Sequence, residues 1–344
     1  MRRHLPRVLL LLALSACGHA TANPQATPAT GLDVGPAPAP APARLASLIG
    51  EYGLSGRTTH MVLEDNGTLV LRTPTSVLQL TSVGSDVYSA PDGLAVTFTR
   101  DSRGRAEWMD AGGMRLPRIA VGPESGNQLV VTPVRPISEL RREALAASPP
   151  VESGPFRPSD LVELTQLDPT IKLEIRYATS NNLFGTPFYT QARAFMQRAP
   201  AEAVVRANAS LKPMGFGLLI HDGYRPWYVT KMFWEGAPLD KRIFVANPAE
   251  GSKHNRGAAV DLSMYDLKTG APVDMVSTYD ETTSRAAANY PGGTSLQRWH
   301  RLVLRRAMEA QRFGVNPTEW WHFDFADWRD YAIGVVRFED IGAR

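Results

Sequence analysis

SKHNRGAAVDL, residues 252–262, contains a histidine and an aspartate, His254 and Asp261, separated by a glycine and two alanines. Successive side chains of a β-strand point to opposite faces, so a strand over AAVDL presents Asp261 on a single face. Gly257 can bend the preceding turn back, which brings His254 toward Asp261. The small residues then leave room for an ion and its substrate. The stretch predicts part of a metal site, and a surface loop that enters a strand is the alternative.

A second stretch, PTEWWHFDF at residues 317–325, supplies the other half of this prediction. As a strand it has one aromatic face, and His322 points to the opposite side. Glu319 stands three residues earlier, where its carboxylate could reach a bound water without itself binding the metal. Two histidines and one carboxylate leave one position of a zinc ion open, which is typical of catalytic zinc sites. Taken alone, EWWH is equally consistent with an aromatic core that contains a hydrogen-bonded histidine.

A third stretch, HDGYRP at residues 221–226, follows an apolar segment that we expect to be a strand. Arg225 precedes a proline, which restricts its backbone. A guanidinium group suits a carboxylate or a developing oxyanion. A surface salt bridge is the alternative for this arginine when the motif stands alone.

The composition bounds the class of protein. The chain has 344 residues, of which 43% are hydrophobic and 21% charged, with a net charge of +3 and a pI near 9.0. These values predict a globular protein with more than one domain. Lysines and arginines are dispersed and form no stripe with interleaved aromatic residues, so we expect no nucleic-acid partner.

Residues 1–17 have the pattern of a lipoprotein signal peptide: a basic start, an apolar run too short to span a membrane, and small residues that end at Cys17. The ending LSAC resembles the bacterial lipobox, in which the cysteine is lipidated. Lipidation would also account for a single cysteine in an exported protein. We therefore expect an exported bacterial lipoprotein, anchored in the membrane and facing the periplasm. An ordinary signal peptide with an incidental cysteine is the alternative.

The composition changes twice after this signal. Residues 18–44 are rich in alanine and proline and predict a disordered tether. Residues 45–134 contain short apolar runs separated by turn signals such as Asn66-Gly67, and they predict a small antiparallel β module, a barrel or sandwich of six to eight strands. We expect residues 135–159 to be a linker.

Residues 160–338 mix strand-like and helix-like segments and predict an α+β domain, with a small antiparallel sheet flanked by helices. Residues 201–211 have a helical pattern and residues 215–222 a strand pattern. Thr294 and Gln297 have capping-box spacing and predict a helix start, and Gly314 is the expected stop.

Four stretches of this domain together resemble one family. SKHNRGAAVDL fits the pattern S-x-H-x-x-G-x-A-x-D, EWWH fits E-x-W-H, and DGYRP fits the arginine motif of the zinc D-alanyl-D-alanine dipeptidases, the family that includes the vancomycin-resistance dipeptidase. IRYATSNNLFGTPFY, residues 175–189, is similar to the N-terminal signature of that family. The four stretches occur in the family's order, and the resemblance covers residues 160–338.

The resemblance implies a role for each matched position. The residues matched to the ligands of one Zn²⁺ per chain are His254, Asp261 and His322. Glu319 is matched to the general base, and Arg225 is matched to the group that stabilises the transition state. Ser252 and Asp280 fall where the family contacts its dipeptide. Asp280 is matched to the acceptor of the substrate ammonium. The family commonly has a glycine and a phenylalanine where this chain has Val276 and Tyr279.

The function that the resemblance implies is the zinc-dependent hydrolysis of D-Ala-D-Ala, or of a similar free dipeptide from cell-wall peptide metabolism. A zinc D,D-carboxypeptidase or endopeptidase that acts on peptidoglycan stem peptides is one alternative. A non-catalytic wall-binding lipoprotein is the other, and it would lack a ligand or the base. The expected partners are a small peptide, the membrane through the lipid anchor, and the cell wall through the β module.

Overall fold

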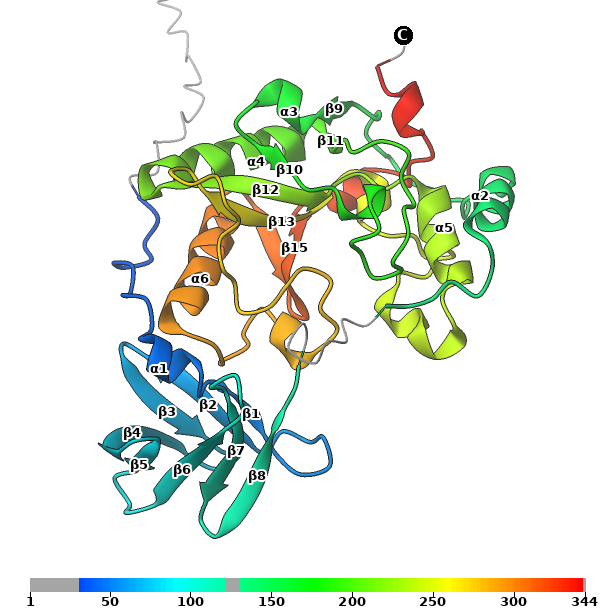
Figure 1. Cartoon of the computed structure of the whole chain (residues 1–344). Helices are drawn as coiled ribbons and strands as arrows, with labels where there is room; N and C mark the ends of the chain where they lie inside the picture. The colour runs from blue at the N-terminus through cyan, green and yellow to red at the C-terminus, as the bar shows by residue number, and fades with distance from the viewer. Residues whose placement is uncertain (1–30, 122–129, 343–344) are drawn as a thin grey trace, which may run out of the picture. The chain divides into compact units, whose positions relative to one another are not determined.

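The computed structural model describes residues 31–121 and 130–342 (Figure 1). The predicted signal peptide with Cys17 and the first part of the predicted tether lie outside the described residues. None of the helices in these two described ranges is long and apolar enough to cross a membrane.

The N-terminal module is a closed barrel of eight antiparallel strands, in which β1 pairs with both β2 and β8. The strands are β1 Gly50–Tyr52, β2 His60–Asp65, β3 Thr68–Arg72, β4 Val77–Gly84, β5 Val87–Ser89, β6 Ala95–Arg100, β7 Ala106–Ala111 and β8 Met114–Ile119. Asn66 and Gly67 join β2 to β3 with φ of 46° and 85°, the positive values that a tight hairpin turn requires at both positions. The prediction of an all-β module is confirmed.

The C-terminal domain contains a five-stranded sheet in the order β10-β12-β13-β15-β14. Its strands are β10 Lys172–Leu173, β12 Phe216–Asp222, β13 Ala259–Asp266, β14 Phe313–Asn316 and β15 Glu319–Phe325. The expected antiparallel sheet is wrong at one edge, because β10 pairs with β12 in parallel. The connection between β10 and β12 includes a helix, which carries the chain back so that β12 runs in the same direction as β10. A separate two-stranded sheet pairs β9 Leu161–Glu163 with β11 Phe195–Gln197.

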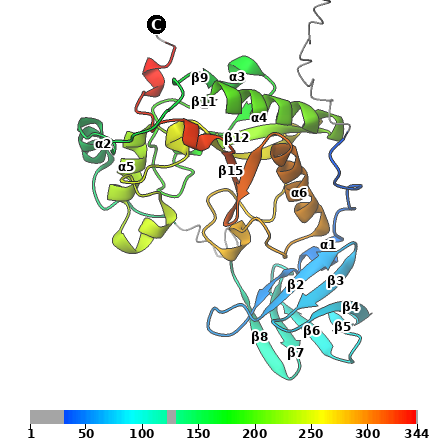
Figure 2. The same ribbon diagram turned by 180° about the vertical axis from the view of Figure 1, so that it is seen from behind.

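Two long helices, α4 Arg198–Leu211 and α6 Ser295–Glu309, contact each other and the sheet. Figures 1 and 2 show α4 along β12 from both sides. The predicted capping box of α6 is present, with Thr294 and Gln297 bonded reciprocally. The predicted stop is wrong: α6 ends at Glu309, the chain turns at Arg312 with φ of 68°, and Gly314 lies in β14.

The segment that we expected to be a linker contains a helix, α2 Ile137–Ala146. Its apolar residues Leu140 and Ala144 are buried, and α2 packs against α5 Trp227–Gly236. Leu140 and Ala144 are four positions apart, which places them on one face of a helix. The apolar face of α2 therefore belongs to the core of the C-terminal domain.

The predicted tether also differs from expectation where the structure describes it. Leu32 and Val34 pack against the core of the C-terminal domain. The indole Nε1 of Trp299 donates a hydrogen bond to the carbonyl oxygen of Val34 at 3.2 Å. Two further short α-helices within the described residues are α1 Ala43–Ala46 and α3 Leu164–Leu167.

Two buried glutamates of the barrel bond to the C-terminal domain. Glu51 accepts hydrogen bonds from the hydroxyls of Tyr290 at 2.8 Å and Ser284 at 3.2 Å. Glu64 accepts from the backbone N–H of Ser295, the first residue of α6, at 2.8 Å. An acidic group at a helix N-terminus satisfies a free N–H and interacts favourably with the helix dipole. Glu64 therefore joins the barrel to α6.

We predict that Glu64→Ala lowers the free energy of unfolding of the full chain by about 1–3 kcal/mol, because it leaves the buried N–H of Ser295 without its acceptor. Urea unfolding followed by circular dichroism measures the change. Glu107→Ala is the matched control, since Glu107 is an exposed glutamate of the same barrel, and its effect should stay within about 0.5 kcal/mol. Equal effects of the two substitutions would contradict the assigned contact.

Candidate functional site

Three side chains of the C-terminal domain converge on one point. In the register of β13 and β15, Asp261 lies opposite His322. His254 comes from the short turn before β13, residues His254–Arg256, which Gly257 ends with φ of 65°. The Nδ1 of His322 is 2.9 Å from Oδ1 of Asp261, and the Nε2 of His254 is 3.1 Å from that Nδ1. All three residues are positioned to hold a metal ion.

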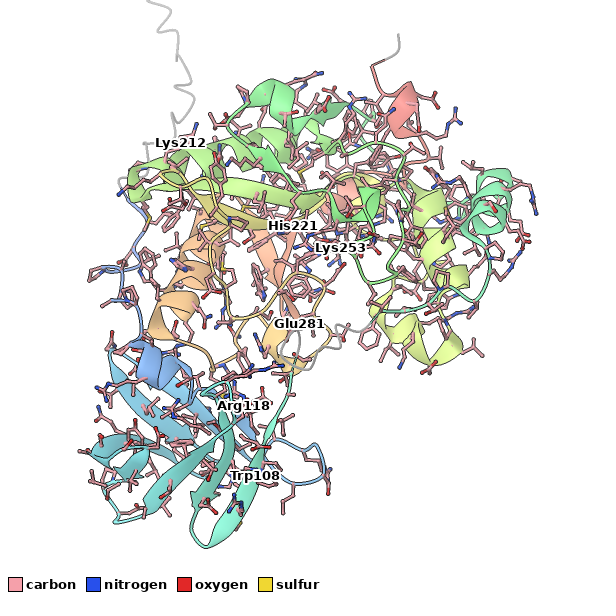
Figure 3. The ribbon with its side chains drawn as sticks, viewed as in Figure 1. Trp108, Arg118, Lys212, His221, Lys253 and Glu281 are labelled. Atoms are coloured by element: carbon pink, nitrogen blue, oxygen red, sulfur yellow. The ribbon has the colours of Figure 1, made fainter. Side chains whose placement is uncertain are left out.

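Each histidine of this cluster has a partner on its other nitrogen. The Nδ1 of His254 is 2.8 Å from the carbonyl oxygen of Gly223. Because a carbonyl oxygen only accepts, Nδ1 carries the proton and Nε2 is free to bind a metal. The Nε2 of His322 bonds to Oδ1 of Asp324 at 2.9 Å, which leaves Nδ1 of His322 to bind the metal. Lys253, labelled in Figure 3, pairs with Asp324.

The charges of the cluster are strongly coupled. Burial alone would lower the pKa of His322, but its bonds to Asp261 and Asp324 outweigh burial and raise this pKa to about 10. Burial would likewise raise the pKa of Asp261, but the two histidines hold it well below its usual range. A cation that binds here therefore meets a carboxylate and displaces a proton from His322.

Glu319 lies beside the cluster without belonging to it. Its Oε2 is 3.8 Å from Nδ1 of His322 and accepts a hydrogen bond from the side chain of Asn316 at 3.0 Å. A register shift between Val315 and Asn316 makes β15 irregular at this end, so simple strand alternation does not apply to Glu319. Burial is the main cause that raises the pKa of Glu319. The carboxyl group therefore holds a proton more readily than an exposed glutamate does.

Arg225 is buried and held by Asp222. Its Nε and Nη2 donate to Oδ2 of Asp222 at 3.0 and 2.7 Å. Oδ1 of Asp222 accepts from the hydroxyl of Tyr189 at 2.7 Å. The backbone N–H of Arg225 also bonds to the carbonyl oxygen of His254 at 3.0 Å. The arginine motif and the histidine turn are therefore one hydrogen-bonded unit, and the surface salt bridge considered for Arg225 does not describe it.

Asp280 and Glu319 line the same cavity, of about 300 Å³. This volume lies at the lower end of the range of roughly 300–1,000 Å³ for small-molecule sites. Oδ2 of Asp280 is buried and has no hydrogen-bond partner among the residues that the structure describes, while Oδ1 accepts from the hydroxyl of Tyr177 at 3.4 Å. Burial, and then the negative charge of Asp261, raise the pKa of Asp280 to about 7. An unpaired buried carboxyl oxygen suggests a ligand that donates to it.

Ser252 has a local contact. Its hydroxyl accepts a hydrogen bond from the backbone N–H of His254 at 3.2 Å, and its own N–H donates to Oδ1 of Asn255 at 2.7 Å. Ser252 therefore shapes the turn that carries a candidate ligand. Its predicted contact with substrate stays a prediction.

Several groups of the site were not singled out from the sequence. Asp222 stands three residues before Arg225, and Asp324 stands two residues after His322 on the same face of the strand. Both spacings are visible in the sequence and place each aspartate near its partner. The hydroxyls of Tyr177 and Tyr279 reach Asp280 and Asp261 from more distant segments. No local pattern indicates such contacts.

The fold and site define a metal-binding hydrolase domain, and comparison with known proteins gives its family. Residues 157–338 match the Peptidase_M15 family, described as D-ala-D-ala dipeptidase. The chain belongs to this family of metallopeptidases.

Three curated relatives carry the name D-alanyl-D-alanine dipeptidase. One from Escherichia coli K12 is 30% identical over 180 residues, which are 52% of this chain and 92% of the relative. One from Enterococcus faecalis V583 is 31% identical over 175 residues, 46% of this chain and 87% of the relative. One from Streptomyces coelicolor is 31% identical over 185 residues, 48% of this chain and 90% of the relative. The similarity therefore spans nearly the whole of each relative and about half of this chain.

Proposed function

We propose that this chain hydrolyses D-Ala-D-Ala, or a closely similar free dipeptide of cell-wall peptide metabolism, with one Zn²⁺ per chain. The observation that carries the proposal is a single small cavity lined by Glu319, which adjoins the His254–Asp261–His322 cluster, and by Asp280, whose buried Oδ2 has no partner among the described residues. Family membership supports the reaction class, and these contacts support the small substrate with a free amine.

The donor set fits zinc. Two imidazole nitrogens and one carboxylate oxygen are the ligands of many catalytic zinc sites. Acceptors on the other nitrogens of His254 and His322 orient both rings. When bound, Zn²⁺ would act as a Lewis acid toward the substrate carbonyl and the attacking water.

The protein groups around this site then have distinct roles. Glu319 takes the proton of the attacking water and later delivers it to the leaving amine. Arg225, oriented by Asp222, stabilises the negative charge that develops on the carbonyl oxygen. Loss of such a donor typically costs about 100- to 1,000-fold in rate.

Asp280 accounts for the choice of a free dipeptide. Its buried Oδ2 accepts a hydrogen bond from the α-ammonium of the substrate, which an N-blocked stem peptide cannot supply. A D,D-carboxypeptidase or endopeptidase would have no use for this unpaired acceptor. The non-catalytic alternative lacks support as well, because the candidate ligands and the base are all present.

We also propose that Cys17 carries a lipid that anchors the protein at the membrane surface, facing the periplasm, and that the β module contacts the cell wall. The lipobox sequence LSAC and the single cysteine support the anchor. Each buried methylene of an acyl chain contributes about 0.8 kcal/mol, so two or more chains hold a protein firmly.

Glu319→Gln is expected to retain zinc and to lower kcat by about 100-fold or more, because the amide cannot accept the proton of water. His322→Ala is expected to lose the metal. Metal analysis of the purified full chain and assays with D-Ala-D-Ala measure both effects. His60→Ala, in the barrel, is the control and should change neither. Full zinc occupancy in His322→Ala would refute the ligand assignment, and loss of zinc in Glu319→Gln would make Glu319 a ligand.

Free D-Ala-D-Ala is expected to be cleaved roughly 10- to 150-fold faster than its N-acetyl derivative, the range for a charged hydrogen bond of about 1.5–3 kcal/mol. Because the pKa of Asp280 is raised to about 7, the carboxyl group becomes neutral as the pH falls through 7. The ratio of the two kcat/KM values should therefore decline below pH 7 and be flat in Asp280→Asn. A pH dependence that comes from Glu319 applies to both substrates and cancels in the ratio of their kcat/KM values. Equal rates in the unmodified protein would favour the carboxypeptidase alternative.

Cys17→Ser is expected to move the protein from the membrane fraction to the soluble fraction of cells, with kcat and KM for D-Ala-D-Ala unchanged. Fractionation followed by immunoblotting measures the change. Membrane association that persists in this variant would contradict lipidation of Cys17.

A further inference from the structure

The third candidate ligand, Asp261, also has an outer partner, which comes from a different part of the chain. Oδ1 of Asp261 faces the two histidine nitrogens, at 2.9 Å from His322 and 3.3 Å from His254. Oδ2 accepts a hydrogen bond from the hydroxyl of Tyr279 at 3.0 Å. The two oxygens of this carboxylate thus have different surroundings, one directed to the metal site and one occupied by a tyrosine.

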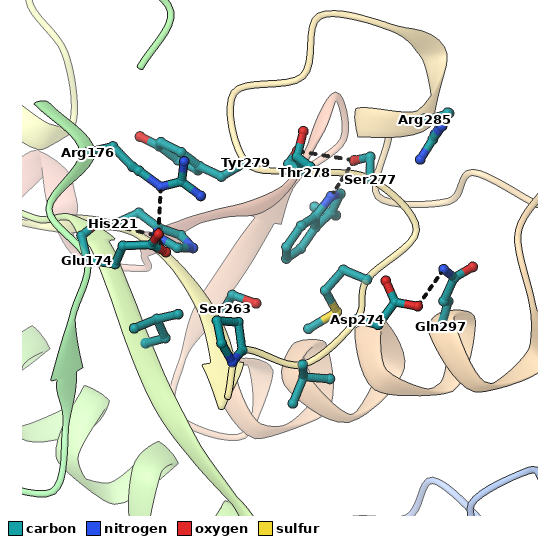
Figure 4. Close-up of a pocket in the computed structure, with 15 residues that line it drawn as sticks. Glu174, Arg176, His221, Ser263, Asp274, Ser277, Thr278, Tyr279, Arg285 and Gln297 are labelled. Carbon is teal, nitrogen blue, oxygen red and sulfur yellow. Dashed lines mark hydrogen bonds and ion pairs between the residues drawn. The ribbon is translucent and has the colours of Figure 1, made fainter. Parts of the chain in front are cut away.

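The ring of Tyr279 is held on several sides. It stacks on His221 with centroids 4.6 Å apart and planes 28° apart, and meets Trp321 edge to face at 5.5 Å. The guanidinium carbon of Arg176 lies 5.9 Å from its centroid. Figure 4 shows Tyr279, His221 and Arg176 together at one end of a cavity of about 310 Å³. Tyr279 is 3% exposed, so its hydroxyl has little freedom to leave Asp261.

His221 supports this ring by stacking on it. Burial is the main cause that lowers its pKa to about 4, so the imidazole is neutral at pH 7 and stacks without a charge. Its Nδ1 is 3.4 Å from Oε2 of Glu174. His221 lies outside the cluster of three candidate ligands in the described part of the chain.

We propose that Tyr279 is a positioning residue for the metal, which acts by holding Oδ2 of Asp261 so that the carboxylate binds through Oδ1 alone. The inference rests on the proposed metal site. A carboxylate without this bond can rotate about its own axis or offer both oxygens to a cation. The bond removes this freedom before the metal arrives, and outer partners of this kind typically contribute 10- to 100-fold to metal affinity.

The position of Tyr279 also connects the metal ligand to the substrate acceptor. Asp280 follows it directly and has φ of 60°, a left-handed conformation that few residues other than glycine adopt. The fixed ring of Tyr279 therefore holds the backbone on one side of Asp280. Tyr279, which orients the candidate metal ligand Asp261, is thus adjacent in the chain to Asp280, the proposed acceptor of the substrate ammonium.

Tyr279→Phe tests the proposal because it keeps the ring contacts and removes only the hydroxyl. The affinity of the metal-free full chain for Zn²⁺ is measured by competition with a chelating dye. Tyr279→Phe is expected to weaken it by about 10- to 100-fold. Tyr265→Phe is the matched control: Tyr265 lies in β13, next to β12 and away from the cluster, and its hydroxyl donates to the carbonyl oxygen of Thr170 at 2.6 Å. This control should leave zinc affinity unchanged.

A spectroscopic measurement separates positioning of the ligand from a general loss of stability. The visible absorption of Co²⁺ bound at the same site depends on how the carboxylate binds. The Co²⁺ spectrum should shift in Tyr279→Phe and not in Tyr265→Phe, with the thermal midpoint of each metal-free variant measured in parallel. Zinc affinity within twofold of the unmodified chain, with an unchanged Co²⁺ spectrum, would overturn the proposal. If the unmodified chain bound no Zn²⁺, the proposed function would fail as well, so the two failures are distinguishable.

Discussion

The antiparallel register of β13 with its two neighbours is the constraint on which the site depends. Asp261 lies opposite Asp222 of β12 on one side and opposite His322 of β15 on the other. Because side chains alternate along a strand, a slip of one residue would move Asp261 to the opposite face of the sheet. Burial of β13 over seven of its eight residues makes such a slip costly. The hydrophobic core therefore determines the geometry of the candidate metal site.

Most charged side chains around this strand have a partner of opposite charge. Asp222 holds Arg225, and Asp324 holds both His322 and Lys253. An unpaired charge in a protein interior is costly, so each pair stabilises its members in place. Oδ2 of Asp280, by contrast, has no hydrogen-bond partner among the described residues, which supports the proposed contact with a substrate donor. The pKa of Asp280 is raised because burial, and then the negative charge of Asp261, favour the neutral acid.

The segment between β13 and α6 joins three parts of the molecule. Tyr279 contacts a candidate metal ligand, and Asp280 lines the cavity. Farther along, Ser284 and Tyr290 bond to Glu51 of the barrel. Arg285 donates to the carbonyl oxygen of Val276 at 2.8 Å and so closes the loop on itself. The barrel thus contacts the segment that carries the proposed substrate acceptor, at the end away from the candidate metal ligands.

Local patterns in the sequence were sufficient for the parts of the site that lie within one strand or turn. The spacing of His254 and Asp261, the alternation around His322, and the capping box at Thr294 depend only on strand and helix periodicity, which local sequence sets. The Asn66-Gly67 hairpin belongs to the same class, because its backbone angles are intrinsic to those residues. The helix α2 was missed because its apolar positions are few and its burial depends on packing against α5. The parallel edge strand β10 was missed because two residues carry no periodic signal.

Contacts between distant segments were decided only by the tertiary structure. The hydroxyl of Tyr279 reaches Asp261, 18 positions away, and that of Tyr177 reaches Asp280, 103 positions away. The sequence by itself determined which side chains could bind a metal and move a proton, because these capacities belong to residue types and short spacings. The packing of the sheet and its loops set the other properties of the site. These are the oxygen of Asp261 that faces the histidines, the absence of a partner for Oδ2 of Asp280 among the described residues, and the volume left for a substrate. Such properties depend on distances between segments that no local pattern of the chain specifies.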